Sequence, residues 1–188
     1  KDEELVAYSV LGDSLIWTKQ LRFDLQFPNK PFIDEDPFRV FNIQSIEDSA
    51  NVSNQILVNV SHNNFFPNLL LNLGAATGTE LGSYVHTGRI NQILTYDLTE
   101  DGKDEIIGIG TNNAFDQATV AFFLRSDDIN GHSPLTDEYK INGYQKANEI
   151  KYIRFPRSIV GDAFRMREMN NVPGQIQIDE EEKTILFR

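Results

Sequence analysis

The sequence predicts an all-β fold from two patterns. Apolar and polar residues alternate at period two, which half-buried strands require because successive side chains point to opposite faces of a sheet. Clusters of Gly, Asn, Asp, Ser and Pro separate these stretches and have the composition of turns. The alternating stretches are 40–46, 55–61, 149–155 and 175–178, and the turn clusters are 48–54, 72–82, 125–134 and 170–174. Helical periodicity is hard to find, and nothing indicates strands that alternate with helices.

Taken in order along the chain, the strands fall into groups. Residues 4–26 predict two or three strands around the turn "LGDS". Four strands are expected next, near 39–47, 55–61, 68–73 and 80–86. A similar group is expected within 89–135, and at least four further strands within 136–188, where "IDEEEK" is expected to form the turn of a hairpin.

Sliding the chain against itself by fifty residues aligns 43–73 with 93–123 without a gap. The matched pairs are Ile43/Ile93, Ser45/Thr95, Glu47/Asp97, Ile56/Ile106, Leu57/Ile107, Ser61/Thr111, Asn63/Asn113, Phe65/Phe115 and Leu73/Phe123. Strand, turn, strand, "NN-x-F" turn and strand recur in the same order. We therefore expect an internal repeat, although shared strand periodicity would also produce such matches.

A unit of this length with four short strands has the size of one β-propeller blade, whose sequence periods run from roughly 40 to 50 residues. The predicted organisation is a single propeller-like domain with a partial blade, two full blades and a partial or irregular blade. These units span 1–38, 39–88, 89–135 and 136–188. A complete small propeller and an arc of a larger one both remain open. Because the chain begins without Met, we expect it to be part of a longer protein.

The composition excludes several classes of function. Lys and Arg number 17 against 28 Asp and Glu, a net charge of −11, and no basic block is present, so we expect no nucleic-acid partner. Without cysteine, neither disulfides nor thiolate metal sites are available. The longest apolar runs, such as "NLLLNLG", are far shorter than a membrane helix requires, and we expect no membrane span within this segment.

The stretch "DLTEDGKDEIIGIG", from Asp97 to Gly110, is the clearest candidate site. Calcium takes 6 to 8 oxygen ligands, and acidic side chains at alternate positions of a tight loop point to one place while Gly permits the turn. Asp97, Asp101 and Glu105 are good oxygen donors by this standard. A second interpretation remains open, in which the same residues form a solvated β-turn whose carboxylates face water.

This stretch resembles the calcium-loop repeat of FG-GAP propellers, also called VCBS or integrin-α-like propellers, and "LGDSLIWTKQL" is similar to an outer-strand segment common in them. The resemblance implies a calcium site that stabilises the blade and has no catalytic role. Its ligands would be Asp97, Thr99, Asp101, Glu105 and the backbone carbonyl of Lys103. The sequence departs from the pattern in having Thr99 in place of a carboxylate or amide, and Glu100 in place of a glycine. The matching columns of the preceding repeat hold Glu47, Ser49, Asn51 and Gln55, so that copy is not expected to bind calcium.

Other side chains suggest less specific chemistry. His62, His86 and His132 occupy different positions of their repeats, so we expect surface or turn roles and no shared metal site. Phe65 and Phe115 follow paired asparagines, where they either anchor a hairpin or stack on sugar rings. The tripeptide "NVS" occurs at 51–53 and 59–61, giving glycosylation acceptors only in a secreted eukaryotic protein, and the second lies inside an expected strand.

The expected function is a non-enzymatic, extracytoplasmic binding or scaffold module that presents loops to a protein or glycan, as the FG-GAP resemblance implies. Two alternatives remain: the ligand-sensing extracytoplasmic part of a membrane receptor or sensor kinase, and a propeller hydrolase or lyase. No local catalytic signature supports an enzyme. Fold alone cannot choose among these, because function depends on the sites that a fold carries.

Overall fold

The computed structural model describes residues 3–21, 25–29, 38–46, 54–62, 67–155, 176–179, 181–182 and 184–187. These residues form strands and two short 3-10 turns, which confirms the all-β prediction. The strands are β1 (Glu3–Ser9), β2 (Ser14–Leu21), β3 (Phe38–Ile46), β4 (Gln55–His62), β5 (Asn68–Gly74), β6 (Glu80–His86), β7 (Ile90–Tyr96), β8 (Glu105–Asn112), β9 (Ala118–Arg125), β10 (Gly131–His132), β11 (Lys151–Arg154), β12 (Ile176–Asp179) and β13 (Thr184–Phe187), and the turns are η1 (Asn113–Phe115) and η2 (Asp137–Tyr139).

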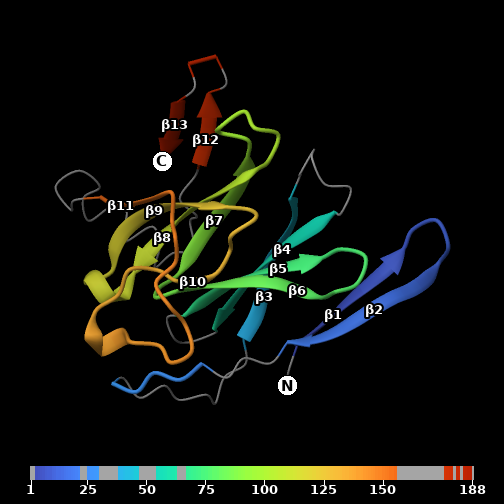
Figure 1. The fold of residues 1–188 in the computed structure, drawn as a ribbon, viewed down its shortest axis with the longest axis horizontal. Helices are drawn as coiled ribbons and strands as arrows, with labels where there is room; N and C mark the ends of the chain where they lie inside the picture. Colours follow the sequence, from blue (N-terminus) through green and yellow to red (C-terminus); the bar gives the residue numbers. More distant parts are fainter. Residues whose placement is uncertain are drawn as a thin grey trace.

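The first sheet has five strands in the order β10-β6-β5-β4-β3 (Figure 1). Strands β3 to β6 form an antiparallel meander, and the bounds of each agree to within one residue with one of the four ranges predicted between residues 39 and 86. The short strand β10 adds to the β6 edge in parallel, with Gly131 paired to Tyr84. Backbone groups at the β6 edge therefore receive partners from a distant segment.

The second sheet has four strands in the order β11-β9-β8-β7. Strands β7 to β9 again form an antiparallel meander. The fourth strand is β11, which pairs antiparallel with β9 and lies beyond the predicted end of this unit at residue 135. The intervening chain first crosses to the first sheet, where it supplies β10, before it returns. The second sheet therefore takes an edge strand from the predicted region 136–188.

The remaining described strands form two separate hairpins, β1–β2 and β12–β13. The second of these places a turn at the predicted "IDEEEK". Among the described strands, no sheet closes on itself, so the observed architecture is all-β with several antiparallel sheets. Among the residues that the structure describes, no helix is long and apolar enough to cross a membrane.

Side chains of the two sheets meet in a shared core. Leu57, Leu70 and Tyr84 of the first sheet pack with Ile106 and Phe122 of the second, and all five are fully buried. Burying each such side chain stabilises the fold by about 2 kcal/mol. Further core layers cover the other faces. One joins the first sheet to the β1–β2 hairpin, and the other joins the second sheet to β12. Layers on both sides explain why β5 and β8 are buried along nearly their whole length.

The two meanders share details of strand pairing at an offset of fifty residues. Strands β4 and β8 begin and end fifty residues apart, and the β3–β4 and β7–β8 pairs have register shifts at matching positions, after Val40 and Ile90. The third strand departs from this offset by one residue. Leu73 pairs with Ile56, whereas the partner of Ile106 is Leu124 and not Phe123. The ungapped alignment therefore holds through β8 and needs one inserted residue before β9.

Candidate functional site

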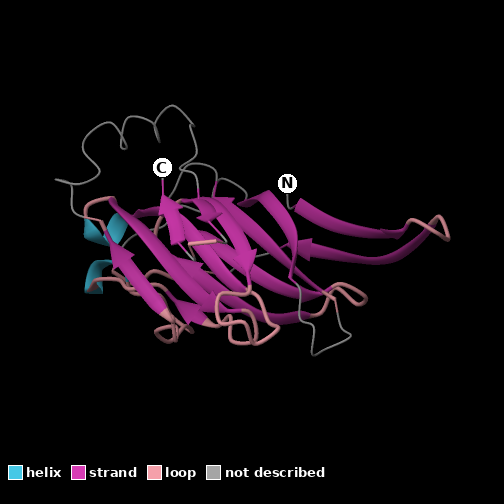
Figure 2. Cartoon of the chain, turned by 90° about the horizontal axis from the view of Figure 1, so that it is seen from above, coloured by secondary structure: helices cyan, strands magenta, loops and turns pink. Residues whose placement is uncertain are grey.

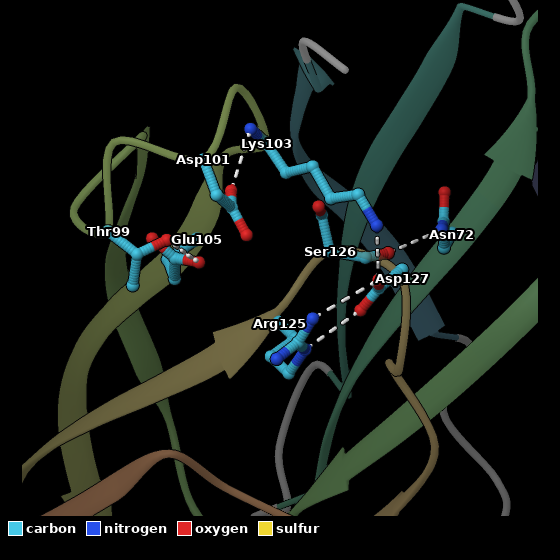
Figure 3. Close-up of polar contacts among 8 residues, drawn as sticks. All are labelled: Asn72, Thr99, Asp101, Lys103, Glu105, Arg125, Ser126 and Asp127. Carbon is cyan, nitrogen blue, oxygen red and sulfur yellow. Dashed lines mark hydrogen bonds and ion pairs between the residues drawn. The ribbon is translucent and has the colours of Figure 1, made fainter. Parts of the chain in front are cut away.

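The predicted site is the loop between β7 and β8, residues 97–104, together with Glu105 at the start of β8 (Figure 3). Two residues in this loop have left-handed backbone conformations, Glu100 with φ 58° and Gly102 with φ 83°. Gly102 adopts this conformation without steric cost, whereas Glu100 is strained there. A glycine at position 100 would adopt this conformation without strain.

The Asp97 carboxylate closes the loop by accepting hydrogen bonds from backbone amides of the loop. Its Oδ1 accepts a hydrogen bond from the Asp101 amide at 3.1 Å, and its Oδ2 accepts one from the Gly102 amide at 2.9 Å. Asp101 continues the pattern, because its Oδ1 accepts from the Lys103 amide at 3.0 Å. Short acidic side chains favour turns because they can satisfy backbone donors in this way.

Glu105 is the innermost member of the predicted set. The residue is 4 % exposed, and its Oε2 accepts a hydrogen bond from the Leu98 amide at 2.9 Å. The Thr99 hydroxyl lies 3.5 Å from Oε1. Burial raises the pKa of this carboxyl, while the hydrogen bonds from the Leu98 and Thr99 backbone oppose that effect. The side chain thus connects the start of β8 to the opposite limb of the loop.

The structure places all five predicted calcium ligands in one turn, but gives their side chains other partners. Both oxygens of Asp97 accept backbone hydrogens. The Lys103 ammonium turns to a different loop, whereas the predicted ligand from this residue is its backbone carbonyl. Within the described residues, no three His, Asp or Glu side chains are grouped as they would be around a metal ion. Asp97, Asp101 and Glu105 each accept hydrogen bonds within the loop, and an ionised carboxylate has further lone pairs for other donors or for a cation. Calcium binding at the loop stays a prediction.

A charged cluster that sequence reasoning missed joins this loop to the end of β9. The Lys103 ammonium lies 2.8 Å from Asp127 Oδ2, and Arg125 Nε lies 3.0 Å from Asp127 Oδ1. The hydrogen bond from Arg125, followed by the one from Lys103, lowers the pKa of Asp127 to about 2. We call these three residues the charge clamp. A spacing of 24 residues between Lys103 and Asp127 leaves no signal in the sequence.

Asn72 of β5 connects the first sheet to the same corner. Its Nδ2 donates to Gln55 Oε1 at 2.7 Å and to the Ser126 carbonyl at 3.3 Å, so it spans the two sheets beside the charge clamp (Figure 3). Its Oδ1 is buried and has no hydrogen-bond partner among the described groups. The Ser126 carbonyl sets the orientation of this amide, because a flipped Asn72 would place its oxygen against an obligate acceptor.

A second polar cluster lies between the sheets and includes a histidine. His86 is fully buried and stacks on Phe122, with ring centroids 5.3 Å apart. Its Nδ1 lies 3.1 Å from the Gly88 carbonyl, and its Nε2 lies 3.2 Å from the Tyr152 hydroxyl. Burial lowers the pKa of His86 to about 4. The predicted surface role was wrong for His86, and also for His62, which is 3 % exposed.

Asn112 completes this cluster at the end of β8. Its Nδ2 donates to the Tyr152 hydroxyl at 2.7 Å and to the Pro134 carbonyl at 2.8 Å. Its Oδ1 accepts from the Thr87 hydroxyl and the Ala114 amide, both at 2.9 Å. All hydrogen-bonding positions of this buried amide are therefore used. Because the Gly88 carbonyl can only accept, Nδ1 carries the proton of the neutral His86 ring, and the Tyr152 hydroxyl donates to Nε2.

The remaining candidates are the phenylalanines predicted to anchor a hairpin or stack on sugars and the asparagines of the two glycosylation tripeptides. Phe115 is partly buried, and the Arg154 guanidinium lies 4.5 Å from its ring centroid, a cation–π contact that covers it. Phe65 and Asn51 lie outside the described residues. Asn59 is 1 % exposed and its Oδ1 accepts from Asn68 Nδ2 at 2.8 Å, so the folded chain does not present it for glycosylation.

Comparisons with known proteins add no family to this description. No protein-family model, curated protein or solved structure matches the chain. The resemblance to FG-GAP propellers therefore rests on the residues of the acidic loop and on the strand pattern.

Proposed function

We propose that this chain is a non-enzymatic, extracytoplasmic binding module that presents the corner around the charge clamp to a protein or glycan ligand. The observation that carries this proposal is the clamp itself, in which Asp127 holds the β7–β8 loop to the end of β9. Function often lies on loops that a rigid scaffold positions. A loop that is ordered before binding loses less conformational entropy when a ligand arrives.

The exposed groups of this corner suit a polar ligand. Glu100, Asp101, Arg125 and Asp127 are exposed, and they offer both acceptors and a guanidinium. Such groups match the hydroxyls of a glycan or the polar rim of a protein interface. The buried groups support the fold instead, because Glu105 and His86 have their hydrogen-bonding atoms engaged within the protein.

We also propose that the two meanders are copies of one repeat within a propeller-like protein. Matching strand bounds and matching register shifts at an offset of fifty residues support this proposal. In that case the loop 97–104 occupies the place of a calcium loop. The hydrogen bonds of Asp97 favour a turn that is complete without an ion.

The binding proposal is tested with the labelled 188-residue chain on arrays of defined glycans and of purified proteins. We expect a ligand whose affinity falls about tenfold or more in Arg125→Ala and Asp127→Ala, because central charged contacts dominate polar interfaces. Asp137→Ala is the matched control, since that residue is exposed in η2, which is part of neither the charge clamp nor the β7–β8 loop. Arrays without any ligand, or equal binding by all variants, would contradict the proposal.

A further inference from the structure

The β1–β2 hairpin extends away from the two sheets as an arm (Figures 1 and 2). Its base is fixed to the body. Trp17 Nε1 donates to the Ala75 carbonyl at 2.8 Å, and the Trp17 ring lies so close to Gly78 that a methyl group there would overlap it. Glu3 Oε2 accepts from the Val40 amide at 2.7 Å. These contacts give the arm a defined direction.

The outer part of the arm exposes large apolar side chains, which we call the distal patch. They are Val6 (46 %), Tyr8 (64 %), Val10 (97 %), Leu11 (102 %), Leu15 (54 %) and Ile16 (49 %). Cross-strand pairing places Tyr8 opposite Leu15 and Val6 opposite Thr18, so these side chains share the face that turns away from the core. Val10 and Leu11 extend the patch around the turn.

The size of the distal patch exceeds what an isolated surface normally exposes. With ordinary side-chain areas, these exposed fractions amount to roughly 700 Å² of accessible surface, whereas the largest patch on a typical monomer is about 300–600 Å². A two-stranded ribbon is also only marginally stable in water without a packing partner. Both arguments indicate that the patch is covered when the protein functions.

We propose that the arm is a dimerisation element, in which the distal patch packs against the same patch of a second copy of this chain. Two such patches would bury at most roughly 1,400 Å² in total, an area within the range of stable, specific interfaces. One surface that pairs with itself across a two-fold axis is the commonest form of homodimer contact. This proposal is independent of the ligand proposed for the charge clamp.

The charges of the chain favour a protein partner over a lipid surface. Between residues 6 and 18 the only side chain that is charged at neutral pH is Asp13, so two copies bring little like charge together at the patch. Of the net charge of −11, all but the charge of Asp13 is carried elsewhere on the chain. The distal patch has no Lys or Arg and belongs to an acidic protein, so it lacks the basic residues that attract anionic membranes.

Sedimentation velocity of the 188-residue chain tests the dimer. We expect a monomer–dimer equilibrium with a dissociation constant at or below about 10 μM, an affinity that interfaces of this size commonly reach. Higher salt should tighten it, because salt screens the repulsion between two acidic chains. The double variant Val10→Ser/Leu11→Ser should weaken association at least tenfold without lowering monomer stability, since both side chains are almost wholly exposed.

The matched control is Leu81→Ser, which removes a half-exposed leucine of β6 outside the arm and should leave the dissociation constant unchanged. Circular dichroism melting confirms that each variant is folded. A chain that stays monomeric at about 200 μM, or a dimer that the double variant does not weaken, overturns the proposal. Flotation of a monomeric wild type with neutral phosphatidylcholine vesicles would assign the patch to lipid and would equally overturn it.

Discussion

His86 and Tyr152 meet between the two sheets, with Nε2 and the phenolic oxygen 3.2 Å apart. His86 ends the last strand of the first meander, and Tyr152 belongs to β11 at the edge of the second sheet. The same hydroxyl accepts from Asn112 at 2.7 Å, so one buried oxygen connects three strands. Buried polar groups that are fully satisfied specify one packing arrangement, because any slip would leave them without partners.

The buried His86 predicts that acid destabilises the fold. Its pKa is about 4 in the folded state against an ordinary value of 6.5, so the unfolded chain binds the proton more readily. The stability that this neutral imidazole supports is fully present above pH 6.5. It is lost progressively as pH falls toward 4, by about 3 kcal/mol in all.

Urea unfolding at pH 7 and pH 4.5 measures this change. The raised pKa values of Glu105 and Glu149 act in the opposite direction, so the informative quantity is the difference between the wild type and His86→Gln. The variant should lose stability at pH 7 and show a smaller drop on acidification. Equal drops in both proteins would contradict the assignment.

The charge clamp predicts an ordered response of the Asp127 pKa. The hydrogen bond from Arg125 is the larger cause of the depression and the one from Lys103 the smaller. Arg125→Met should therefore raise the pKa of Asp127 more than Lys103→Met does. Carboxyl chemical shifts followed by NMR through an acid titration measure both, and the reverse order would show that Lys103 is the principal partner.

The charge clamp should contribute little to the free energy of unfolding. Asp127 is 37 % exposed, so solvent screens its ion pairs and the coupling with Lys103 should be at most about 1 kcal/mol. Because the pKa is lowered in the folded state, this contribution is present above about pH 4 and is lost as pH falls toward 2. A double-mutant cycle of Lys103→Met and Asp127→Asn gives the coupling, which should shrink in 1 M salt.

The hydrogen bonds of Asp97 predict that the acidic loop folds without calcium. We expect the same melting temperature in millimolar calcium and in EDTA. Asp97→Ala should destabilise the fold by about 1 kcal/mol in both, because the Asp101 and Gly102 amides lose their acceptor. A calcium-dependent rise of the melting temperature that disappears in Asp97→Ala would instead support the calcium interpretation.

One methyl group added at Gly108, in the interior of the second sheet, should strongly lower the folding stability. A Cβ at Gly108 would lie 2.0 Å from the Phe122 ring, which is itself buried against Tyr84 and His86. Gly108→Ala should cost about 3 kcal/mol or more of folding stability. Gly143→Ala serves as the control, since its Cβ would meet open space and the cost is limited to its φ of +81°, about 1 kcal/mol.

Chemical denaturation measures both glycine variants. Phe122→Leu in the Gly108→Ala background should recover part of the loss, because the smaller side chain leaves room for the methyl group. If the two substitutions are additive, the steric account of Gly108 is incorrect.

Local pattern was sufficient to predict much of this protein. Alternation at period two located β3, β4, β11 and β12, and the acidic stretch from Asp97 to Glu105 forms the expected turn. Both depend on residues close in sequence: which face of a strand is apolar, and which short side chains satisfy a turn. The propeller and its ligand remain predictions for the same reason, since closure and recognition are not properties of a local pattern.

Contacts between distant residues settled the rest. The fourth strand of the second sheet came from Lys151–Arg154, after the chain had crossed to the first sheet. His86 is buried because Phe122 and Tyr152 cover it, and Lys103 finds Asp127 in another loop. A sequence written in one dimension contains these residues but not their distances, and burial, pKa and strand pairing all depend on which surfaces pack together.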